Sequence, residues 1–357
     1  MSKRRPRQVD VARHAGVSPA IVSLVLNGKI DDKIRISPQT VERVRASMRE
    51  LGYMPNPVAR SLATGHNRIL GVFTYEPLFP LQTESFYFPF LVGIEDQAEA
   101  LDYDLLLFTR SRHHDGRRSV YRDGVNQLLM ADGSILFGRD VEASEIERLT
   151  LEAYPFVSIG RVDSEAPYDY VAADYAGATR DVVEYLVERG HRVIAYLGAP
   201  DRAVSYRERE RGFRQAHDDN RLPLDPRRVL FSDPETLLGE HLDALLAAGA
   251  TALVCENHRL AAALLRLARE RRLAIPRDVS LALLGEHHRP SDALASCTTF
   301  RIPLYAMGVE AVRLLGEALE GRSDHRQTTL SCDFVAGHTV ATIDTPSPPS
   351  THRAPDA

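Results

Sequence analysis

The chain has few cysteines and no long apolar segment. Its 357 residues include three cysteines, which are widely spaced and form no Cys-x-x-Cys pair, so we expect reduced thiols rather than disulfides or a zinc site. No stretch approaches the ~20 apolar residues of a transmembrane helix. The basic start is not followed by the apolar core of a secretory signal. These absences predict a cytoplasmic protein that does not enter a membrane.

The common catalytic signatures are also missing. The sequence contains no Gly-x-x-x-x-Gly-Lys-[Ser/Thr], no His-Glu-x-x-His and no Gly-x-Ser-x-Gly, and no Gly-x-Gly-x-x-Gly follows the first predicted strand. The histidines at 113–114 and 287–288 lie in polar segments without a third ligand at a metal-binding spacing, so we interpret them as surface side chains. The sequence therefore predicts neither an enzyme nor a cofactor or metal site.

Charge is distributed unevenly along the chain. The formal net charge is −5, but residues 1–65 hold 12 Lys and Arg against five Asp and Glu, a balance of +7. The rest of the chain is therefore acidic, at −12. A small basic segment on an acidic body indicates that this segment alone contacts a polyanion. On charge alone, a solvated basic tail is the alternative.

The basic segment is patterned as three short helices. The first covers residues 7–14 and stops at Gly16, which can take the positive φ of a tight turn. The second, over residues 18–28, and the third, over 37–51, each begin with a capping serine and a proline. The first two, joined by a short turn, are typical of a helix-turn-helix. Apolar residues at helical spacing are expected to form its core: Val9, Ala12, Ile21, Val22, Val25, Val41, Val44, Met48 and Leu51.

A fourth helical signal lies in residues 56–65. Asn56 caps, Pro57 begins and Gly65 ends a helix of about seven residues, which is marginal in water without a packing partner. Two copies side by side on DNA would provide that partner, with Leu62 inserted into the minor groove as an apolar wedge. The alternative is a plain interdomain linker.

After Arg68 short apolar runs alternate with amphipathic stretches. This alternation predicts an α/β fold with parallel sheets covered by helices on both faces, in two linked lobes rather than one large sheet. A ligand would lie beyond the carboxyl ends of the strands, in the cleft between the lobes. Strands are expected at 69–74, 103–108, 133–137, 155–159, 193–198, 228–231, 251–255 and 279–284, and helices at 90–101, 176–189, 207–218 and 260–271.

Several motifs resemble the LacI/GalR family of bacterial repressors. In the basic segment they are Asp10-Val-Ala-Arg-His-Ala-Gly-Val-Ser18, Val25-Leu-Asn27, Ser37-Pro-x-Thr40 and Leu51-Gly-Tyr-x-Pro-Asn-Pro-Val-Ala-Arg-Ser-Leu62. In the body they are Gly190-His-Arg-Val-Ile-Ala-Tyr-Leu-Gly198, Arg209-Glu-Arg-Gly-Phe213, Ile275-Pro-Arg-Asp-Val-Ser280 and Thr298-Thr-Phe-Arg-Ile-Pro303. The match follows the family's spacing, which no single short motif could establish.

The resemblance implies a helix-turn-helix headpiece at residues 1–55, a hinge helix and linker at 56–67, and a periplasmic-binding-protein-like, two-lobed, doubly wound α/β effector domain at 68–344. The N-lobe would cover about 68–165 and 299–328, and the C-lobe about 166–298 and 329–344. Closure of the lobes on the effector would change the spacing of two headpieces in a dimer. The Pro-, Ser- and Thr-rich tail, 345–357, is predicted to be disordered, and it has no leucine heptad to form a tetramer.

The resemblance also implies DNA contacts from the second helix and the hinge helix. One position departs from the family, because Leu24 stands where an arginine or another polar base-reading residue is usual. No guanidinium can contact that base pair, so readout there would depend on a thymine methyl group, on DNA shape or on other side chains. The expected DNA-binding residues are Arg7, Ser18, Pro19, Ala20, Ser23, Leu24, Asn27, Lys33, Asn56, Arg60 and Leu62.

Effector contacts carry over to Phe86, Tyr87, Arg161, Arg209, Asn257 and His287. Arg209 can fork onto hydroxyls, a carboxylate or a nucleobase, and a surface ion pair with Glu208 or Glu210 is its alternative. The two aromatic residues would stack on a ligand ring, or else serve as core. His258 and His287 replace acids common in the family, and residues 73–85 form a long first loop. The ligand could therefore be a sugar or an acidic or phosphorylated molecule.

Together these features predict a sequence-specific transcription regulator, a repressor, acting with the nucleoid in the cytoplasm. A homodimer would bind a near-palindromic double-stranded operator, because two-fold symmetry matches two half-sites. A sugar or sugar derivative would control its operator affinity. Two alternatives are less consistent with the sequence. A sugar-modifying enzyme fused to a DNA-binding head lacks a nameable nucleophile or base, and a solute-binding protein would have an export signal and no headpiece.

Leu62→Ala is expected to weaken binding to a specific operator by about tenfold or more, and binding to non-specific DNA far less, because the wedge acts on a kinked duplex. Fluorescence anisotropy on a selected operator and on a scrambled duplex of equal length measures both affinities. An equal loss on the two duplexes would remove the wedge from the mechanism.

Overall fold

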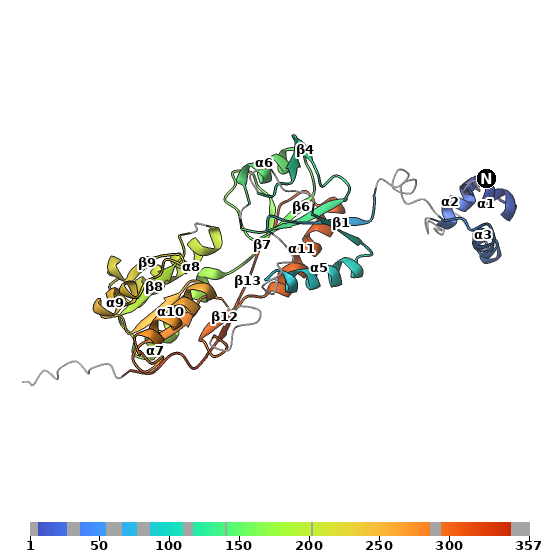
Figure 1. Cartoon of the computed structure of the whole chain (residues 1–357). Coiled ribbons are helices and arrows are strands. Elements are labelled where there is room, and N and C mark those ends of the chain that lie inside the picture. The colour runs from blue at the N-terminus through green and yellow to red at the C-terminus, as the bar shows by residue number, and fades with distance from the viewer. Residues whose placement is uncertain are drawn as a thin grey trace, which may run out of the picture. The chain divides into compact units, whose positions relative to one another are not determined.

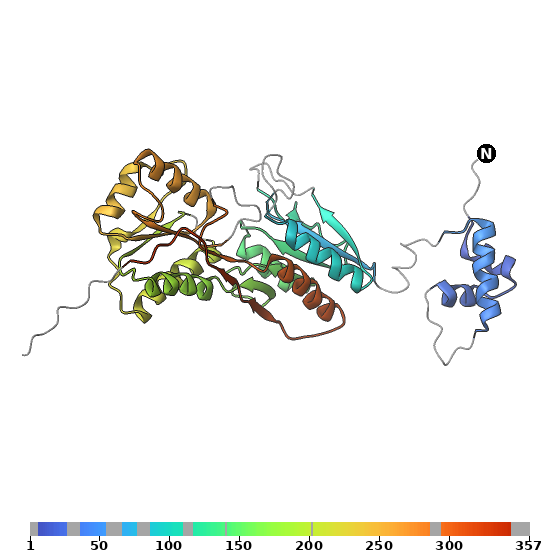
Figure 2. The same ribbon diagram turned by 90° about the horizontal axis from the view of Figure 1, so that it is seen from below.

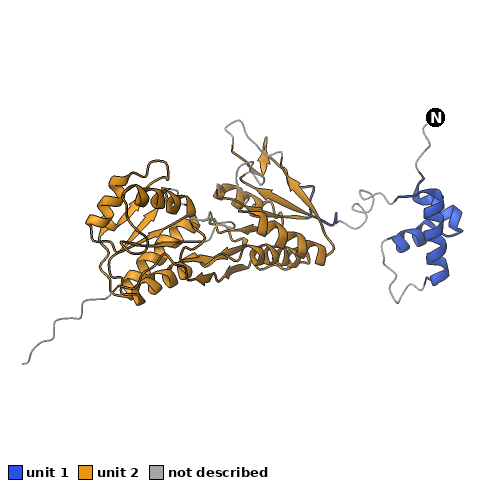
Figure 3. Cartoon of the chain, turned by 60° about the horizontal axis from the view of Figure 1, so that its bottom comes forward, with its two compact units in different colours: residues 1–69, 130–132 blue, residues 70–129, 133–357 orange. Residues whose placement is uncertain are grey.

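The computed structural model describes residues 6–26, 36–54, 66–76, 86–109, 117–139, 141–200, 203–285 and 294–343. It divides into two compact units (Figure 3). The first comprises residues 1–69 and 130–132, and the second comprises residues 70–129 and 133–357. The predicted hinge helix and the C-terminal tail lie outside the described residues.

The first unit contains the three predicted head helices, α1 (Gln8–Ala15), α2 (Pro19–Leu26) and α3 (Pro38–Leu51) (Figure 1). Gly16 ends α1 with φ of +64°, in the left-handed conformation that the sequence predicted. The hydroxyl of Ser18 accepts a hydrogen bond from the backbone N–H of Ile21 at 3.4 Å, as expected of an N-cap. Local sequence signals thus fix where α1 ends and where α2 begins.

The core of the head differs from the predicted one in three places. Val9 is 46% exposed, and Ile21 and Val41 are only half-buried and lie outside the core, whereas Val22 is fully buried. Each helix is rotated slightly from the predicted face, because three short helices must share one small core. The buried members of that core are Val11, Ala12, Ala15, Val22 and Val44.

In its described residues the second unit contains two large sheets and two small antiparallel pairs of strands, and the larger sheet belongs to the N-lobe. Its strand order is β13-β7-β6-β5-β1-β2, and the pairs from β13 to β1 are parallel. Helices α5 (Phe88–Ala100) and α11 (Leu304–Leu319) lie side by side against it (Figures 1 and 2). The lobe also contains α6 (Ala143–Leu151). The strands are β1 (Ile69–Thr74), β2 (Asp104–Phe108), β5 (Gly133–Phe137), β6 (Phe156–Ile159), β7 (Asp169–Ala173) and β13 (Gln327–Leu330), with a small hairpin of β3 (Tyr121–Arg122) and β4 (Val125–Asn126).

The C-lobe has a four-stranded parallel sheet of order β11-β10-β8-β9. Its elements are β8 (Ile194–Gly198), β9 (Val229–Phe231), β10 (Ala252–Cys255), β11 (Ser280–Leu283), α7 (Tyr175–Glu188), α8 (Val204–Asp219), the short η1 (Pro226–Arg228), α9 (Gly239–Ala247) and α10 (His258–Glu270). Gly212 brings α8 close to α7, because a Cβ there would lie 2.3 Å from the carbonyl oxygen of Ala176. The predicted fold, a helical head followed by two parallel α/β lobes, is confirmed.

The lobe boundaries differ from the expected ones. Strand β7 follows residue 165 yet pairs with β6 and β13 in the N-lobe sheet, so this sheet extends to Ala173 and to Leu330. The chain crosses between the lobes three times, and two of the crossings form the antiparallel pair β12 (Thr299–Arg301) and β14 (Asp333–Val335). The β7 sequence Asp-Tyr-Val-Ala-Ala lacks the continuous apolar run that identifies a buried parallel strand.

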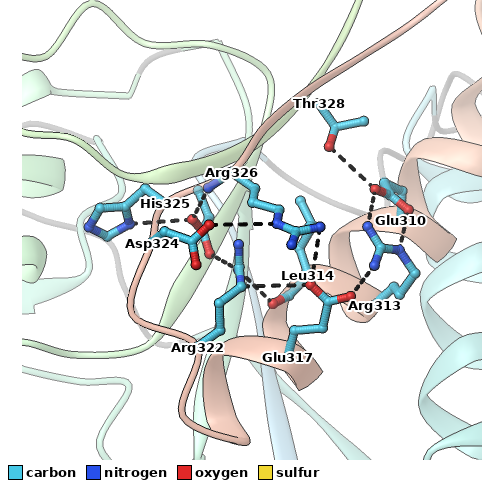
Figure 4. Close-up of polar contacts among 10 residues, drawn as sticks. Glu310, Arg313, Leu314, Glu317, Arg322, Asp324, His325, Arg326 and Thr328 are labelled. Atoms are coloured by element: carbon cyan, nitrogen blue, oxygen red, sulfur yellow. Dashed lines mark hydrogen bonds and ion pairs between the residues drawn. The ribbon is translucent and has the colours of Figure 1, made fainter.

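A cluster of charged side chains covers the end of the N-lobe sheet where β7 and β13 begin (Figure 4). The carboxylate of Asp169, 5% exposed, pairs with Arg322, 9% exposed, and accepts the backbone N–H of Arg326 at 2.7 Å. Arg322 also forms an ion pair with Glu317, with 3.7 Å between its Nε and the Oε2 of the carboxylate. Because burial removes water from both ions, Arg322 and Asp169 depend on each other for charge compensation.

Asp169→Asn is expected to lower the free energy of unfolding by about 3 kcal/mol, because Arg322 would remain buried without its main counter-ion. Asp324→Asn is the matched control. Its carboxylate is 72% exposed and meets Arg326 only at 4.0 Å, so its loss should cost less than about 1 kcal/mol. Urea denaturation followed by circular dichroism measures both. If both variants lose the same small amount of unfolding free energy, Arg322 does not depend on Asp169 to compensate its charge.

Candidate functional site

The head exposes the beginning of α2. Pro19 and Ala20 are exposed and Ser23 and Leu24 are half-buried, on a helix whose Val22 is fully buried. The first turn of α2 contains no acidic residue, so no side chain there repels a phosphate from the helix N-terminus. Arg7 and Ser18 are also exposed, at the starts of α1 and α2. The other predicted DNA-binding residues lie outside the described residues: Asn27, Lys33, Asn56, Arg60 and Leu62.

The second unit contains a cavity of about 730 Å³ lined by both lobes. Residues that directly follow the strands reach it, namely Gly138 and Gly160 in the N-lobe and Ala199, Glu256 and Leu284 in the C-lobe. The carboxyl ends of both parallel sheets therefore meet at this cavity. This is where open α/β sheets bind ligands, and where the sequence analysis expects the effector.

Aromatic side chains form the N-lobe wall. The ring of Tyr87 lies 5.5 Å from that of Phe86 and 5.1 Å from that of Phe137, centroid to centroid, and Phe90 stacks on Phe137 at 6.1 Å. The Tyr87 hydroxyl donates a hydrogen bond to the carboxylate of Glu76. Because its hydroxyl is held in this way, Tyr87 offers the cavity mainly its ring.

Arg209 is the central cation of the C-lobe wall. It is only 6% exposed, and its guanidinium donates to the carbonyl oxygens of Leu284 at 3.1 Å and Ser205 at 3.0 Å. The guanidinium also lies 4.0 Å from the centroid of the Tyr175 ring, in cation–π contact. Because a guanidinium has five N–H groups, Arg209 retains donors for a ligand in the cavity.

The alternative role for Arg209, a surface ion pair, does not match the structure. Glu208 pairs with Arg161 at 3.1 Å, and Glu210 pairs with Arg214 at 2.8 Å. Among the described residues no carboxylate lies within ion-pair distance of Arg209. A buried guanidinium in this setting is a candidate ligand-binding group.

Glu256 and Asn257 follow strand β10 and enter the cavity wall. The amide oxygen of Asn257 caps α10 by accepting the backbone N–H of Leu260 at 3.1 Å, which leaves the amide nitrogen as its ligand-facing donor. The carboxyl of Glu256 accepts a hydrogen bond from the Tyr196 hydroxyl and another, at 2.7 Å, from the backbone N–H of Ala199. Burial raises the pKa of Glu256 to about 7, although these hydrogen bonds and the charge of Arg209 oppose the rise.

Polar contacts also join the lobes beside the cavity. They come from three consecutive residues at the start of α8, directly before Arg209. The guanidinium of Arg161 contacts Glu208 at 3.1 Å and that of Arg139 donates to Tyr206 at 3.4 Å. The contacts link Arg139 to Tyr206, Asp163 to Arg207, and Arg161 to Glu208.

The structure brings together five of the six predicted effector residues, Phe86, Tyr87, Arg161, Arg209 and Asn257, around one cavity. His287 and most of the loop 73–85 lie outside the described residues. Glu76, Arg139, Tyr175 and Glu256 also line the cavity, and they are not among the residues predicted from the sequence. One sequence signal could have identified Glu256. It is an acidic residue directly after the apolar run 252–255, and the residue that follows a buried parallel strand lies at the end of the sheet where ligands bind.

The described part of the chain holds no group of three or more His, Cys, Asp or Glu side chains placed to bind a metal ion. The paired histidines at 113–114 and 287–288 fall outside it. No single helix within the described ranges is long and apolar enough to cross a membrane. Helices α1 and α2 reach that length and apolar content only when they are taken together, and a bend of 107° separates them.

Comparison with known proteins agrees with this architecture. Residues 9–56 match the model of bacterial regulatory proteins of the lacI family, and residues 183–340 match that of a periplasmic binding protein-like domain. The structure of the transcriptional regulator CelR in complex with cellobiose is similar, with 25% identity and a TM-score of 0.61 over 94% of this chain and 100% of that one. The Lac repressor dimer bound to operator and the anti-inducer ONPF shares the fold, with 24% identity and a TM-score of 0.73 over 95% of this chain and 100% of that one.

Two relatives align over most of their length. The catabolite control protein A of Priestia megaterium is 27% identical over 86% of this chain and 90% of its own. An uncharacterised helix-turn-helix transcriptional regulator in the aml 5′ region of Streptomyces limosus is 30% identical over 92% of this chain and 91% of its own. These are transcription regulators rather than enzymes. The protein therefore belongs to the LacI family of bacterial transcription regulators, with a helix-turn-helix DNA-binding head and a periplasmic-binding-protein-like effector domain.

Proposed function

We propose that the protein is a repressor whose operator affinity is controlled by a sugar or sugar derivative bound in the cavity between its lobes. The observation that carries this proposal is the contrast between the cavity's two walls. Aromatic rings on one side face Arg209 and the amide of Asn257 on the other. A sugar ring presents apolar C–H faces and hydroxyl edges, so it matches both walls at once.

The size and chemistry of the cavity support a sugar. A volume of about 730 Å³ is within the usual range of ligand pockets and suits a mono- or disaccharide. Arg209, Asn257 and Arg161 supply donors, and Phe86 and Tyr87 supply the stacking surface. His287, which the resemblance adds to this set, follows Gly285 at the cavity edge by two positions. The related CelR is described as a complex with cellobiose, which is consistent with this class of ligand.

The contacts between the lobes would link ligand binding to lobe closure. Arg161–Glu208 and Asp163–Arg207 form only when the N-lobe loop after β6 reaches the start of α8. A ligand held by Arg209 on that same helix would favour the arrangement in which these pairs form. Effector binding and closure would then be coupled, because the ligand has different affinities for the two arrangements.

We further propose that two heads of a homodimer read a near-palindromic operator in the cytoplasm, on DNA of the nucleoid. The exposed residues Ser18, Pro19 and Ala20 at the start of α2, with the half-buried Ser23 and Leu24, would enter the major groove. Arg7, Asn27 and Lys33 would contact the backbone or base edges. Asn56, Arg60 and Leu62 would belong to the minor-groove contact. The related Lac repressor is described as a dimer bound to operator, which supports this arrangement.

Asn257→Asp tests the effector site with little effect on folding. The aspartate can still cap α10, but it replaces the amide's N–H donors by an oxygen, so effector affinity is expected to fall by about tenfold or more. DNA affinity without effector should stay within about threefold of the wild type, because α10 remains capped. Arg209→Ala is expected to abolish the effector response.

Arg214→Ala provides the control, since this arginine lies on the same helix outside the cavity and pairs with Glu210. Anisotropy on a selected operator, with and without cellobiose, lactose, galactose and their phosphates, measures response and DNA affinity together. The sign of the response distinguishes inducer from corepressor. An unchanged response in both Asn257→Asp and Arg209→Ala would place the effector elsewhere.

A further inference from the structure

A carboxyl group is built into the C-lobe wall of the cavity. Glu256 follows the fully buried strand β10 and is itself only 1% exposed. Within the described part of the chain it forms no ion pair with any Lys, Arg or His. A carboxyl buried without an ion-pair partner is costly, so its position in the wall of a ligand cavity points to a role toward the ligand.

Two donors fix the orientation of this carboxyl group. The Tyr196 hydroxyl, from β8, occupies one oxygen, and the backbone N–H of Ala199, just after β8, occupies the other at 2.7 Å. A carboxylate accepts up to about four hydrogen bonds, so each oxygen retains capacity for one more. Glu256 lines the cavity, so this capacity is available to a ligand group that reaches the wall.

The charged surroundings of Glu256 come from three directions. Tyr196 on β8 and Arg209 on α8 favour its ionised form, whereas Glu210 on α8 disfavours it. His258 and Arg259, at the start of α10, line the same cavity. Burial outweighs the favourable contacts and raises the pKa of Glu256 to about 7, so the carboxyl changes protonation within the physiological range.

Resting on the proposed function, we propose that Glu256 selects a neutral, hydroxyl-bearing effector by accepting a hydrogen bond from one of its hydroxyls, and that it releases its proton when this effector binds. A hydroxyl donor stabilises the ionised carboxyl. Arg209 lines the same cavity and can donate to a hydroxyl oxygen, so the two side chains together offer a sugar both an acceptor and a donor. A ligand carrying a carboxylate or phosphate at this point would have the opposite effect, because its charge repels ionised Glu256.

This proposal fixes the sign of the pH dependence. Because binding favours the ionised carboxyl, affinity for a neutral sugar rises as pH increases from 6 to 8, by up to about tenfold. The change is steepest below the pKa that Glu256 has in the protein without ligand. Proton release follows the same linkage, approaching about one per site at pH 6 and falling toward zero at pH 8. An anionic ligand would show affinity that falls over this range.

The test is calorimetric titration of the full-length protein with glucose, galactose, cellobiose, maltose and lactose at pH 6, 7 and 8. Each titration is repeated in two buffers of different ionisation enthalpy, so that the number of protons released is measured directly. The tightest-binding sugar of this panel then serves as the probe for the variants. Glucose 6-phosphate is titrated in parallel as the anionic comparison.

Two variants separate the proposed role from a structural one. Glu256→Gln is expected to lower affinity at pH 8 by about tenfold or more and to abolish the pH dependence and proton release. Tyr196→Phe removes a hydrogen bond that lowers the pKa of Glu256, so the midpoint of the affinity profile moves to higher pH. Glu270→Gln, an exposed change at the end of α10 where the carboxylate pairs with Arg266, should leave the wild-type profile intact.

The outcomes distinguish this proposal from the proposed function. If a panel sugar binds but Glu256→Gln retains the wild-type pH profile and proton release, the role of Glu256 is overturned while the sugar effector stands. If the affinity of the wild type for its neutral sugar falls with rising pH, the sign is wrong and the proposal fails even without a variant. If only glucose 6-phosphate binds, or no member of the panel binds, the neutral-sugar effector is overturned and the proposal with it.

Discussion

The guanidinium of Arg209 is buried where the two lobes meet, and much of the cavity is arranged to hold it there. Within the described part of the chain it is compensated by two backbone carbonyls and by the face of Tyr175 rather than by a carboxylate. Gly285 belongs to the same arrangement. Its φ of +102° suits glycine, and a Cβ there would lie 3.2 Å from the guanidinium. A cation held without a counter-ion keeps its attraction for a ligand's oxygens, because no permanent partner cancels its charge.

Helix α8 connects this buried cation to the relation between the lobes. Its first turns carry the contacts to Arg139, Asp163 and Arg161, and Arg209 follows within the next turn. Gly212, farther along, lets the helix pack closely on α7. One rigid helix is therefore anchored in the C-lobe, faces the ligand and meets the N-lobe. Small changes at the cavity can act on the lobe interface through it, since packed helices move as units.

The cavity also contains a carboxyl group with a shifted pKa. Burial raises the pKa of Glu256 to about 7. Nothing in the local sequence Cys-Glu-Asn-His sets that behaviour. It arises because the fold buries the carboxyl and excludes water from it, and the donors from Tyr196 on β8 and from the backbone of Ala199 offset only part of the rise. The same residue on an exposed loop would be an ordinary ionised acid.

The sequence by itself determined many of the elements and five of the residues that line the cavity. Buried parallel strands are continuous apolar runs, so segments such as 133–137 were found at their observed bounds. Capping serines and Gly16 likewise marked helix ends, because these signals act within a few residues. The family motifs supplied Arg209 and Asn257, which the structure places on one cavity. Tertiary structure decided what depends on distant neighbours. It set the face of α2 that is buried, the sheet that β7 joins, the ring that covers Arg209 and the pKa of Glu256, because burial and pairing are settled only when segments far apart in sequence come together.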